Sequence, residues 1–373
     1  MSTNDQLGLT VPKAIFAWCL AFVIGGFAAV LAMLTCQYLF SLGGRDVVEK
    51  HGISNNVASR LGGVAIVFYI ACHLSYQAVM GMYSPSAAEG VILMIALAYF
   101  LLGILEDLAG NLSARLRFSV MLLLAIVALF IAPQLILKPV GLPLVDMILE
   151  SPMMAAMFTG VCIAFIPNAF NTADGANGLA AGIALAVMFA LSRVVPPDLL
   201  PLFAAGAVGS SVFLVFNLLG GRFFLGDGGA YFLGVLCGLC IIVVANRGDA
   251  SVWMLLSLVF YPVADLLWSM WRRFRRGAPV FGADNSHCHN LIFNGLRACG
   301  LSSQSANTAS GVGVALVFAW APAVLFVSGS VAADSAVWLG VVVFQALIYG
   351  TIVNALRAQG AHKTSYNGEE GKR

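Results

Sequence analysis

The segment FLGDGGAYFLGVLCGLCIIVV, residues 224–244, shows what kind of fold to expect. From residue 229 onward it is apolar, and a helix of about 17–25 such residues crosses the hydrocarbon core of a bilayer. At its start stands one acid, Asp227, between Gly226 and Gly228, and glycines let a ligand approach the backbone closely. We therefore expect a transmembrane helix that carries a polar motif at one membrane surface.

The rest of the chain repeats this apolar character. Of its 373 residues, 60% are hydrophobic and only 10% are charged, whereas a soluble domain carries roughly a quarter charged residues. The pattern predicts an all-α, polytopic transmembrane helical bundle that forms one integral-membrane domain over residues 1–373. The first span is too long for a signal-peptide core and is expected to be retained. Eleven spans are predicted, at 14–40, 61–81, 88–105, 117–137, 152–168, 178–194, 200–219, 229–245, 252–271, 308–328 and 335–356.

Cys237 and Cys240 form a CxxC pair inside the apolar run. Redox chemistry or metal binding is one interpretation of this spacing, and packing of two small side chains in a buried helix is the other. The neighbouring residues are apolar, so packing is favoured and no disulfide framework is predicted.

The basic residues are distributed unevenly between the two sides of the predicted bundle. Fifteen of the 19 Lys and Arg residues fall in loops after odd-numbered spans or in the C-terminal tail. Because cytoplasmic loops of membrane proteins are enriched in Lys and Arg, these loops and the C-terminus are expected in the cytoplasm, with the N-terminus outside. The net charge of +2 comes without a basic face, so no nucleic acid partner is expected.

Polar motifs follow the same side of the membrane. They occupy residues 45–63, 105–118, 168–182, 220–234 and 272–296, and the loops on the other side carry nothing comparable. A transporter more often has its polar residues near the middle of the bilayer and in broken helices. Five polar loops on one face indicate the walls of a single cytoplasmic site.

Four acids stand at the predicted junctions between spans and cytoplasm: Glu106, Asp107, Asp174 and Asp227. Any one of them could be a solvated loop residue or a helix cap. Together on one face they would repel one another unless cations were present, and Mg²⁺ prefers such oxygen ligands and shares them with substrate phosphates. The set therefore favours a magnesium site.

Histidines and arginines mark the last polar loop. His287 and His289 follow four arginines in RRFRRGAPVFGADNSHCHN, a setting suited to anions. The alternative is a zinc ion bound by the two histidines, with Cys288 and Cys299 as the further ligands. Arg272 and Arg273 could be membrane anchors or could hold a lipid phosphate. The intramembrane acid Asp265 is either functional or pairs two helices.

These motifs in this order resemble the polyprenyl-phosphate N-acetylhexosamine-1-phosphate transferases, the glycosyltransferase family 4 type that includes the phospho-N-acetylmuramoyl-pentapeptide transferase. The resemblance covers a motif core from Arg60 to about Ser302 and rests on SRLGG, LEDLAGNLSARLR, NAFNTADGANGLA, FLGDGGAYFLG and DLLWSMWRRFRRGAPVFGADNSHCHN. It implies that a sugar-1-phosphate moves from a UDP-sugar donor to undecaprenyl phosphate with Mg²⁺, or Mn²⁺ in its place, and that UMP is released.

Roles for individual residues follow from the resemblance. It implies metal ligation by Asp227 and Asn171, and phosphate or lipid-phosphate binding by Arg60, Arg272 and Arg273. A nucleotide pocket is implied for Asn168, Asn171, Asp174, Asn177 and Phe224, and catalytic roles for Glu106, Asp107, His287 and His289. Two positions depart from the family pattern, because Glu106 stands for the first Asp of a pair and Asn290 for a third His.

The implied setting is the bacterial inner membrane, with the active site on the cytoplasmic face. The spaced HCHN motif is closer to the branch that starts O-antigen in lipopolysaccharide. Membrane lipid is another expected partner. A homodimer is one assembly that the chain could form. Direct attack by the lipid phosphate is favoured, with Asp107 positioning it or taking its residual proton, and a phosphorylated Asp intermediate is the alternative. Two other functions stay open, a transporter of a lipid-linked or nucleotide sugar and an inactive scaffold relative.

Overall fold

The computed structural model describes residues 23–31, 34–35, 38, 45–46, 58–81, 83–220, 223–280, 282, 284–329 and 335–370. The predicted span 14–40 and the segment 45–60 of the first polar loop lie largely outside these residues. Within the described chain, eight helices are long and apolar enough to cross a membrane, or nine if one bent pair counts as a span. The helical membrane class is therefore confirmed.

The long apolar helices match the predicted spans closely. Their bounds are α2 (Gly62–Val79), α3 (Ala87–Ala109), α4 (Ala114–Ile131), α6 (Pro152–Ala173), α8 (Leu200–Gly220), α9 (Gly226–Arg247), α13 (Ser303–Ala315) continued by η2 (Leu316–Trp320) and α14 (Ala321–Val327), and α15 (Ser335–Glu370). Shorter elements are β1 (Arg45–Asp46), β2 (Ala58–Ser59), η1 (Pro133–Leu135), α5 (Pro143–Leu149), α7 (Leu179–Leu191), α10 (Val252–Leu258), α11 (Phe260–Arg275) and α12 (Cys288–Ala298).

Two predicted spans differ from the structure. The span at 178–194 is the helix α7, whose 13 residues extend only about 20 Å. Gly178, at a φ of 78°, starts it, and the Pro196–Pro197 pair prevents its continuation. The span at 252–271 is broken into α10 and α11, which meet at 76°. The ring of Pro262 would clash with the carbonyl of Leu258 four residues earlier, which is where α10 ends.

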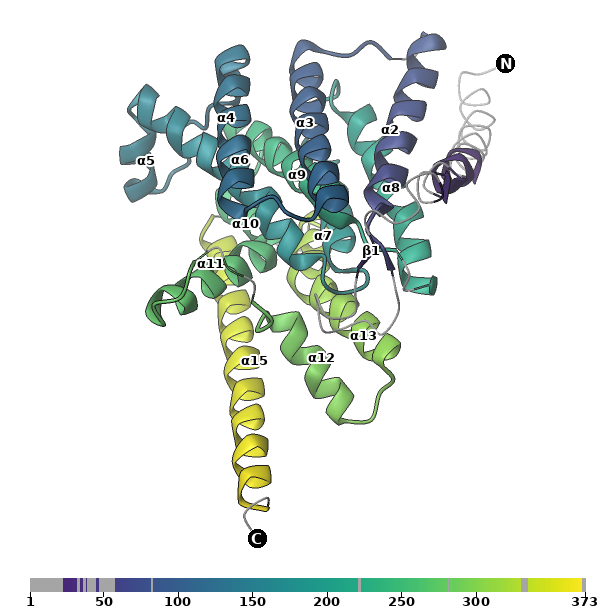
Figure 1. Ribbon diagram of the computed structural model, residues 1–373. Coiled ribbons are helices and arrows are strands. Elements are labelled where there is room, and N and C mark those ends of the chain that lie inside the picture. Colours follow the sequence, from purple (N-terminus) through teal and green to yellow (C-terminus); the bar gives the residue numbers. More distant parts are fainter. Residues whose placement is uncertain are drawn as a thin grey trace, which may run out of the picture.

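Helix α9 is the centre of the bundle. It is buried almost along its whole length and packs against α2, α3, α6 and α7 (Figure 1). Glycines make this close packing possible: a Cβ added to Gly63 of α2 would lie 2.3 Å from the Cα of Gly229. A Cβ on Gly103 of α3 would lie 2.4 Å from the Gly228 nitrogen. The ends of α2 and α3 are thereby brought to the start of α9.

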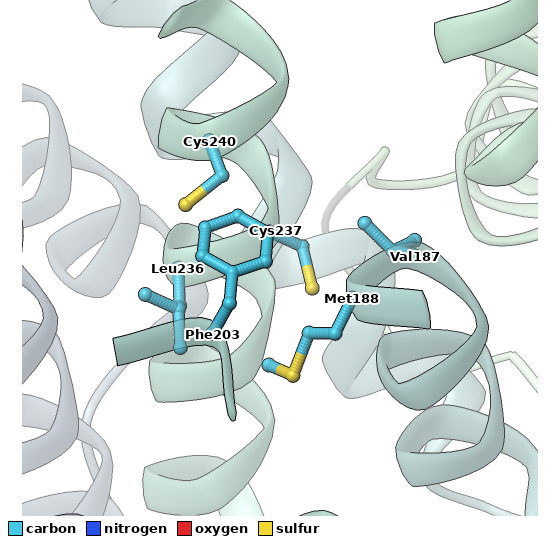
Figure 2. A pocket seen from close by; sticks show the side chains of 6 residues that line it. All are labelled: Val187, Met188, Phe203, Leu236, Cys237 and Cys240. Atoms are coloured by element: carbon cyan, nitrogen blue, oxygen red, sulfur yellow. The ribbon is translucent and has the colours of Figure 1, made fainter. Parts of the chain in front are cut away.

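The CxxC pair lies in the packed interior of the bundle. Figure 2 shows Cys237 and Cys240 on α9 facing Phe203 of α8 and Met188 of α7. The lining is apolar, the space between these side chains does not admit a water molecule, and both thiols are free. The pair therefore serves helix packing here.

The C-terminal third of the chain forms the end of the bundle that carries the histidines. Helices α10, α11 and α12 all pack against α15, which runs on past the rest of the molecule (Figure 1). Helix α12 also packs against α13. The helices on both sides of the loop between α11 and α12 are therefore held by α15.

Candidate active site

The acids predicted to converge do so at the N-terminus of α9. Asp107, in the last turn of α3, accepts hydrogen bonds from the backbone N–H groups of Asp227 and Gly228, each at 3.0 Å to a different carboxylate oxygen. The N-terminal N–H groups of a helix have no partner within the helix and attract negative charge. Asp107 thus caps a helix that begins 120 residues further along the chain.

Two arginines hold these acids together. The Nη2 atom of Arg60 donates to Asp227 Oδ1 at 2.7 Å, and its Nε atom lies 3.5 Å from Asp107 Oδ1. The Nη1 atom of Arg117 donates to Asp227 Oδ2 and to the Tyr231 hydroxyl, the latter at 3.1 Å. Both oxygens of the buried Asp227 carboxylate are therefore paired with guanidinium groups.

Glu106 has a different role from its neighbour Asp107. Its Oε2 atom accepts a hydrogen bond from the Leu112 N–H at 2.8 Å, which holds the turn between α3 and α4. Its Oε1 atom lies 3.8 Å from Arg117 Nη1. Glu106 therefore shapes the loop that carries Arg117, while Asp107 contacts α9 directly.

Asp174 joins the end of α6 to the same centre. Its carboxylate accepts hydrogen bonds from the backbone N–H groups of Leu225, at 3.4 Å, and Gly226, at 3.0 Å. Burial raises the pKa of Asp174 well above its usual range, although Arg60 and the two N–H donors oppose that shift. Gly226 has a φ of 70°, and a Cβ there would lie 1.9 Å from the Arg60 carbonyl oxygen. The turn that brings these groups together requires glycine.

Backbone pairing fixes Arg60 in the site. Phe224 donates its N–H to the Ser59 carbonyl at 2.9 Å, and its own carbonyl accepts from Gly62 at 3.0 Å. Gly63 donates to the Leu225 carbonyl at 3.0 Å. The Phe224 side chain, expected in the nucleotide pocket, is buried beside this ladder. No sequence pattern had pointed to this pairing of segments about 160 residues apart.

The histidine motif forms a second polar cluster. The Nδ1 atom of His287 lies 2.6 Å from Asp265 Oδ2, and the Nδ1 atom of His289 lies 2.8 Å from the Tyr261 hydroxyl. The two imidazole rings are stacked, with centroids 5.7 Å apart and planes 4° from parallel. Both histidines are buried and held through the same ring nitrogen.

The two clusters meet beside Asp174. A Cβ added to Gly175 would lie 2.8 Å from His289 Nε2, so that this nitrogen lies against the residue that follows Asp174. The histidines therefore border the acids and arginines at the polar motif loops.

Arg272 and Arg273 contact the loop that precedes the histidines. Arg272 donates to the Asp284 carboxylate and to the Ser286 carbonyl, the latter at 3.1 Å, and Arg273 donates to the Val280 carbonyl at 2.9 Å. Burial tends to raise the pKa of Asp284, but hydrogen bonds from Ser269 and Ser286 and the charge of Arg272 outweigh it and lower the pKa below its ordinary value. These arginines order the histidine loop.

The three asparagines of the stretch 168–177 point in different directions. Asn168 donates to the Ala164 carbonyl at 2.8 Å and contacts the Met121 sulfur on α4. Asn171 is partly exposed one turn before the end of α6. Asn177 is buried, and its backbone N–H donates to Asn307 Oδ1 at 2.7 Å. Of the polar residues in this stretch, Asp174 contacts the start of α9, where the acid cluster lies.

Asn217 was not predicted and ties the site together. Its Oδ1 atom accepts from the Gly178 N–H and its Nδ2 atom donates to the Phe223 carbonyl, both at 2.6 Å. It lies inside the apolar helix α8, and a polar residue in a transmembrane span was the available signal.

The donor chemistry at the N-terminus of α9 fits a hard cation better than zinc. Asp107 and Asp227 supply the carboxylate oxygens that Mg²⁺ prefers, and their charges are balanced here by arginines. Among the residues that the structure describes, no group of three His, Cys, Asp or Glu is arranged to hold a metal ion. Cys288 and Cys299 lie at opposite ends of α12, about 16 Å apart along its axis, so they cannot share one zinc.

The fold and the site define a polytopic helical membrane protein whose charged centre can hold anionic groups among arginines, histidines and acids. Residues 90–245 match the model of glycosyl transferase family 4, so this part of the chain is similar to that family. The match spans α3 to α9 and includes the Asp107–Asp227 contact.

Curated relatives are consistent with this similarity to glycosyl transferase family 4. Over 335 residues, 87% of each chain, the protein is 25% identical to a probable undecaprenyl-phosphate N-acetylglucosaminyl 1-phosphate transferase of Bacillus subtilis (strain 168). It is 28% identical over 266 residues, 62% of this chain and 65% of the relative, to a decaprenyl-phosphate N-acetylglucosaminephosphotransferase of Mycobacterium tuberculosis. It is 29% identical over 136 residues, 34% and 37% of the two chains, to an undecaprenyl-phosphate alpha-N-acetylglucosaminyl 1-phosphate transferase of Escherichia coli (strain K12).

Proposed function

We propose that this protein transfers N-acetylhexosamine 1-phosphate from a UDP-sugar to undecaprenyl phosphate, releases UMP and so starts a lipid-linked cell-surface glycan. The relatives are named for transfer of N-acetylglucosamine 1-phosphate to such lipids. The observation that carries the proposal is the meeting of Asp107, Asp227, Arg60 and Arg117 at the start of α9, beside the histidine pair.

The proposed reaction is a direct displacement. An oxygen of the lipid phosphate attacks the phosphorus that bears the sugar, and the bond from that phosphorus to the bridging oxygen breaks, so that UMP leaves with this oxygen. The acceptor is a phosphate monoester with a second pKa of about 6, so it is mostly a dianion at neutral pH. The main barrier is then repulsion between this dianion and the diphosphate, which cationic groups reduce.

The charged residues divide this work in our proposal. Arg60 and Arg117 exchange contacts with Asp227 for contacts with phosphate oxygens, and Asp107 keeps the N-terminus of α9 directed at the site. Mg²⁺, or Mn²⁺ in its place, would be held by Asp227 and Asn171 and would neutralise the diphosphate. Arg272 and Arg273 order the loop beside the lipid phosphate.

The uridine pocket is proposed at the end of α6. Asp174 and Asn171 line it, and Asn168 lies one turn further into the helix. The buried contacts of Asn177 and Phe224 support a role in shaping the pocket wall rather than in stacking on the base. The setting we propose is the bacterial inner membrane, with the N-terminus outside and this pocket at the cytoplasmic face.

The test is release of UMP by the purified full chain given undecaprenyl phosphate and a panel of UDP-sugars. We expect one UDP-N-acetylhexosamine to give UMP and the lipid-linked sugar, with activity lost on chelation and restored by Mg²⁺ but not by Zn²⁺. Transport of a UDP-sugar into vesicles without UMP release would instead favour a transporter. Absence of both activities would favour an inactive scaffold.

A further inference from the structure

Asp265 connects three helices through one buried carboxylate. Its Oδ2 atom lies 2.6 Å from the Nδ1 atom of His287. Its Oδ1 atom accepts hydrogen bonds from the Cys288 N–H at 2.9 Å and from the Tyr349 hydroxyl of α15 at 2.8 Å. An ionised carboxylate only accepts hydrogen bonds, so the His287 nitrogen that faces it must carry the proton. This contact thus requires a proton on Nδ1 of His287, and in the neutral imidazole Nε2 is then the proton acceptor.

His289 is also held through its Nδ1 atom. The Tyr261 hydroxyl oxygen accepts from the His289 backbone N–H at 3.2 Å and lies 2.8 Å from the ring Nδ1 atom. In the arrangement proposed below, the hydroxyl gives its own proton to Nδ1. The Nε2 atom of His289 then carries the ring proton.

In this arrangement the two stacked rings present one acceptor and one donor. Their planes are 4° from parallel, and Nε2 of His289 lies against Gly175 at the border of the acid cluster. A phosphate group that carries one proton is complementary to this pair, because it can donate its O–H to one ring and accept from the other. Asp107, the other acid near the reactants, already accepts a backbone N–H on each oxygen.

We propose that Asp265 is a positioning residue that holds His287 as the Nδ1–H tautomer, so that the two histidines bind the acceptor phosphate in its singly protonated form. The inference rests on the proposed function. The Nε2 atom of His287 takes the proton from the phosphate O–H, which leaves the dianion that attacks and an imidazolium paired with Asp265. His289 donates its Nε2–H to a second phosphate oxygen.

The surroundings of His287 contain several titratable groups. They are Asp265, Arg272, Asp284, Cys288, His289 and Tyr349. The pH dependence that tests the proposal follows the protonation of the substrate phosphate, because the phosphate dianion needs no proton acceptor and the monoanion does. The monoanion is abundant only near and below a pH of about 6.

Asp265→Asn is the principal variant. Its amide carbonyl can still accept from Cys288 and Tyr349, while its NH₂ faces His287 Nδ1 and forces the proton onto Nε2. Such a tautomer change lowers kcat by up to about 10⁴-fold in a serine protease. Because the dianion bypasses the step here, we expect a smaller loss of kcat, about 10- to 100-fold at pH 6, that shrinks to a few-fold at pH 9, with the KM for the UDP-sugar unchanged. An equal loss at both pH values would mean a structural role and would overturn the proposal.

Two further variants distinguish the proposed effect from a folding defect. Tyr349→Phe removes one of the hydrogen bonds to Asp265 and keeps the ring, and it should show the same pH-dependent loss in milder form. Tyr99→Phe is the matched control, since it removes a buried tyrosine hydrogen bond to the Met121 carbonyl elsewhere in the bundle. It should show no pH-dependent loss, and in a His287→Gln background Asp265→Asn should have no further effect. A further loss there would count against action through His287.

A second readout does not depend on turnover. The chain contains five histidines, so ¹⁵N-histidine labelling of the full chain in lipid nanodiscs gives few signals, and His287→Gln assigns the one of interest. We expect the proton on Nδ1 of His287 in the wild type and on Nε2 in Asp265→Asn. A proton on Nε2 in the wild type would refute the positioning role. The expected tautomers without UMP release from any UDP-sugar would overturn the proposed function and leave the tautomer assignment standing.

Discussion

The backbone N–H of Asp227 donates to the Asp107 carboxylate at 3.0 Å, which joins the last turn of α3 to the first turn of α9. One acid of the site thus positions the other. Asp107 is committed to the N-terminus of the central helix, while Asp227 faces the arginines. Glu106 and Asp107, which are adjacent in the sequence, likewise differ in their contacts, and substitutions should separate their roles.

Asp107→Asn should lower kcat by about 100-fold or more, because an asparagine has one acceptor oxygen for two N–H donors and lacks the charge that favours the helix terminus. Glu106→Asp should be milder, since it changes only the reach of a side chain that holds the α3–α4 turn. Comparison of kcat for the two purified variants tests this, and the reverse ranking would overturn the assignment.

Asp227→Asn should abolish measurable transfer and also lower stability. It removes the carboxylate shared by Arg60 and Arg117, and removing one partner of a buried ion pair costs about 3–5 kcal/mol. Thermal unfolding in detergent and UMP release measure the two effects. Asp249→Asn is the control, because Asp249 pairs with Arg247 at the exposed end of the same helix, where a pair contributes about 0–1 kcal/mol. Equal effects of the two variants would contradict the prediction.

Gly226→Ala and Gly248→Ala form a matched pair. Both glycines have a φ near 70°, but a Cβ at Gly226 would lie 1.9 Å from the Arg60 carbonyl, whereas at Gly248 no atom lies within 4 Å. We expect Gly248→Ala to cost about 1 kcal/mol and to keep transfer, since it meets only backbone strain. Gly226→Ala should lose transfer as well, because Arg60 must move away from Asp227. Retained activity in Gly226→Ala would show that the turn is not required.

The proposed orientation can be tested at Gly282, in the exposed loop before the histidines. A Gly282→Cys variant that lacks Cys288 and Cys299 should react with a membrane-impermeant thiol reagent only after the cells are opened. The positive-inside bias of the basic residues is the reason for this expectation. Labelling of intact cells would place the site on the outer face.

Acid should weaken the histidine loop through Asp284. Its pKa is below the ordinary value when folded, so its contribution to stability is complete above the unfolded pKa of about 4 and is lost as the pH falls through the folded pKa. The difference in melting temperature between the wild type and Asp284→Asn should therefore be constant above about pH 5 and shrink below pH 4. A difference that grows on acidification would have the wrong sign.

Apolar length in the sequence predicted the eight long helices of the described chain, because each run of that kind has one stable form in lipid. It did not predict the break between α10 and α11, where the clash of Pro262 with Leu258 had to be weighed against an uninterrupted apolar run. Composition also could not separate α7 from a full span, since its ends depend on Gly178 and on the proline pair after it.

The site was predictable in its residue types but not in its contacts. Acids, arginines and histidines stood out because charge is rare in this chain. The partner of Asp265 on α15, Tyr349, lies 84 residues away in a helix with no motif, so no local sequence pattern predicts this contact. Asn177 matched the family motif, yet its contact with Asn307 depends on how α13 packs, which only the folded chain defines.

The glycine contact between α2 and α9 affects how the protein can respond to bilayers of different thickness. Helices respond to thicker or thinner lipid by tilting. Gly63 and Gly229 leave no side chain between these two helices, and the strand-like hydrogen bonds from Gly62 and Gly63 fasten their ends. We therefore expect the starts of α2 and α9 to stay together when the helices tilt, so that the 2.7 Å contact between Arg60 and Asp227 is kept in thicker and thinner bilayers.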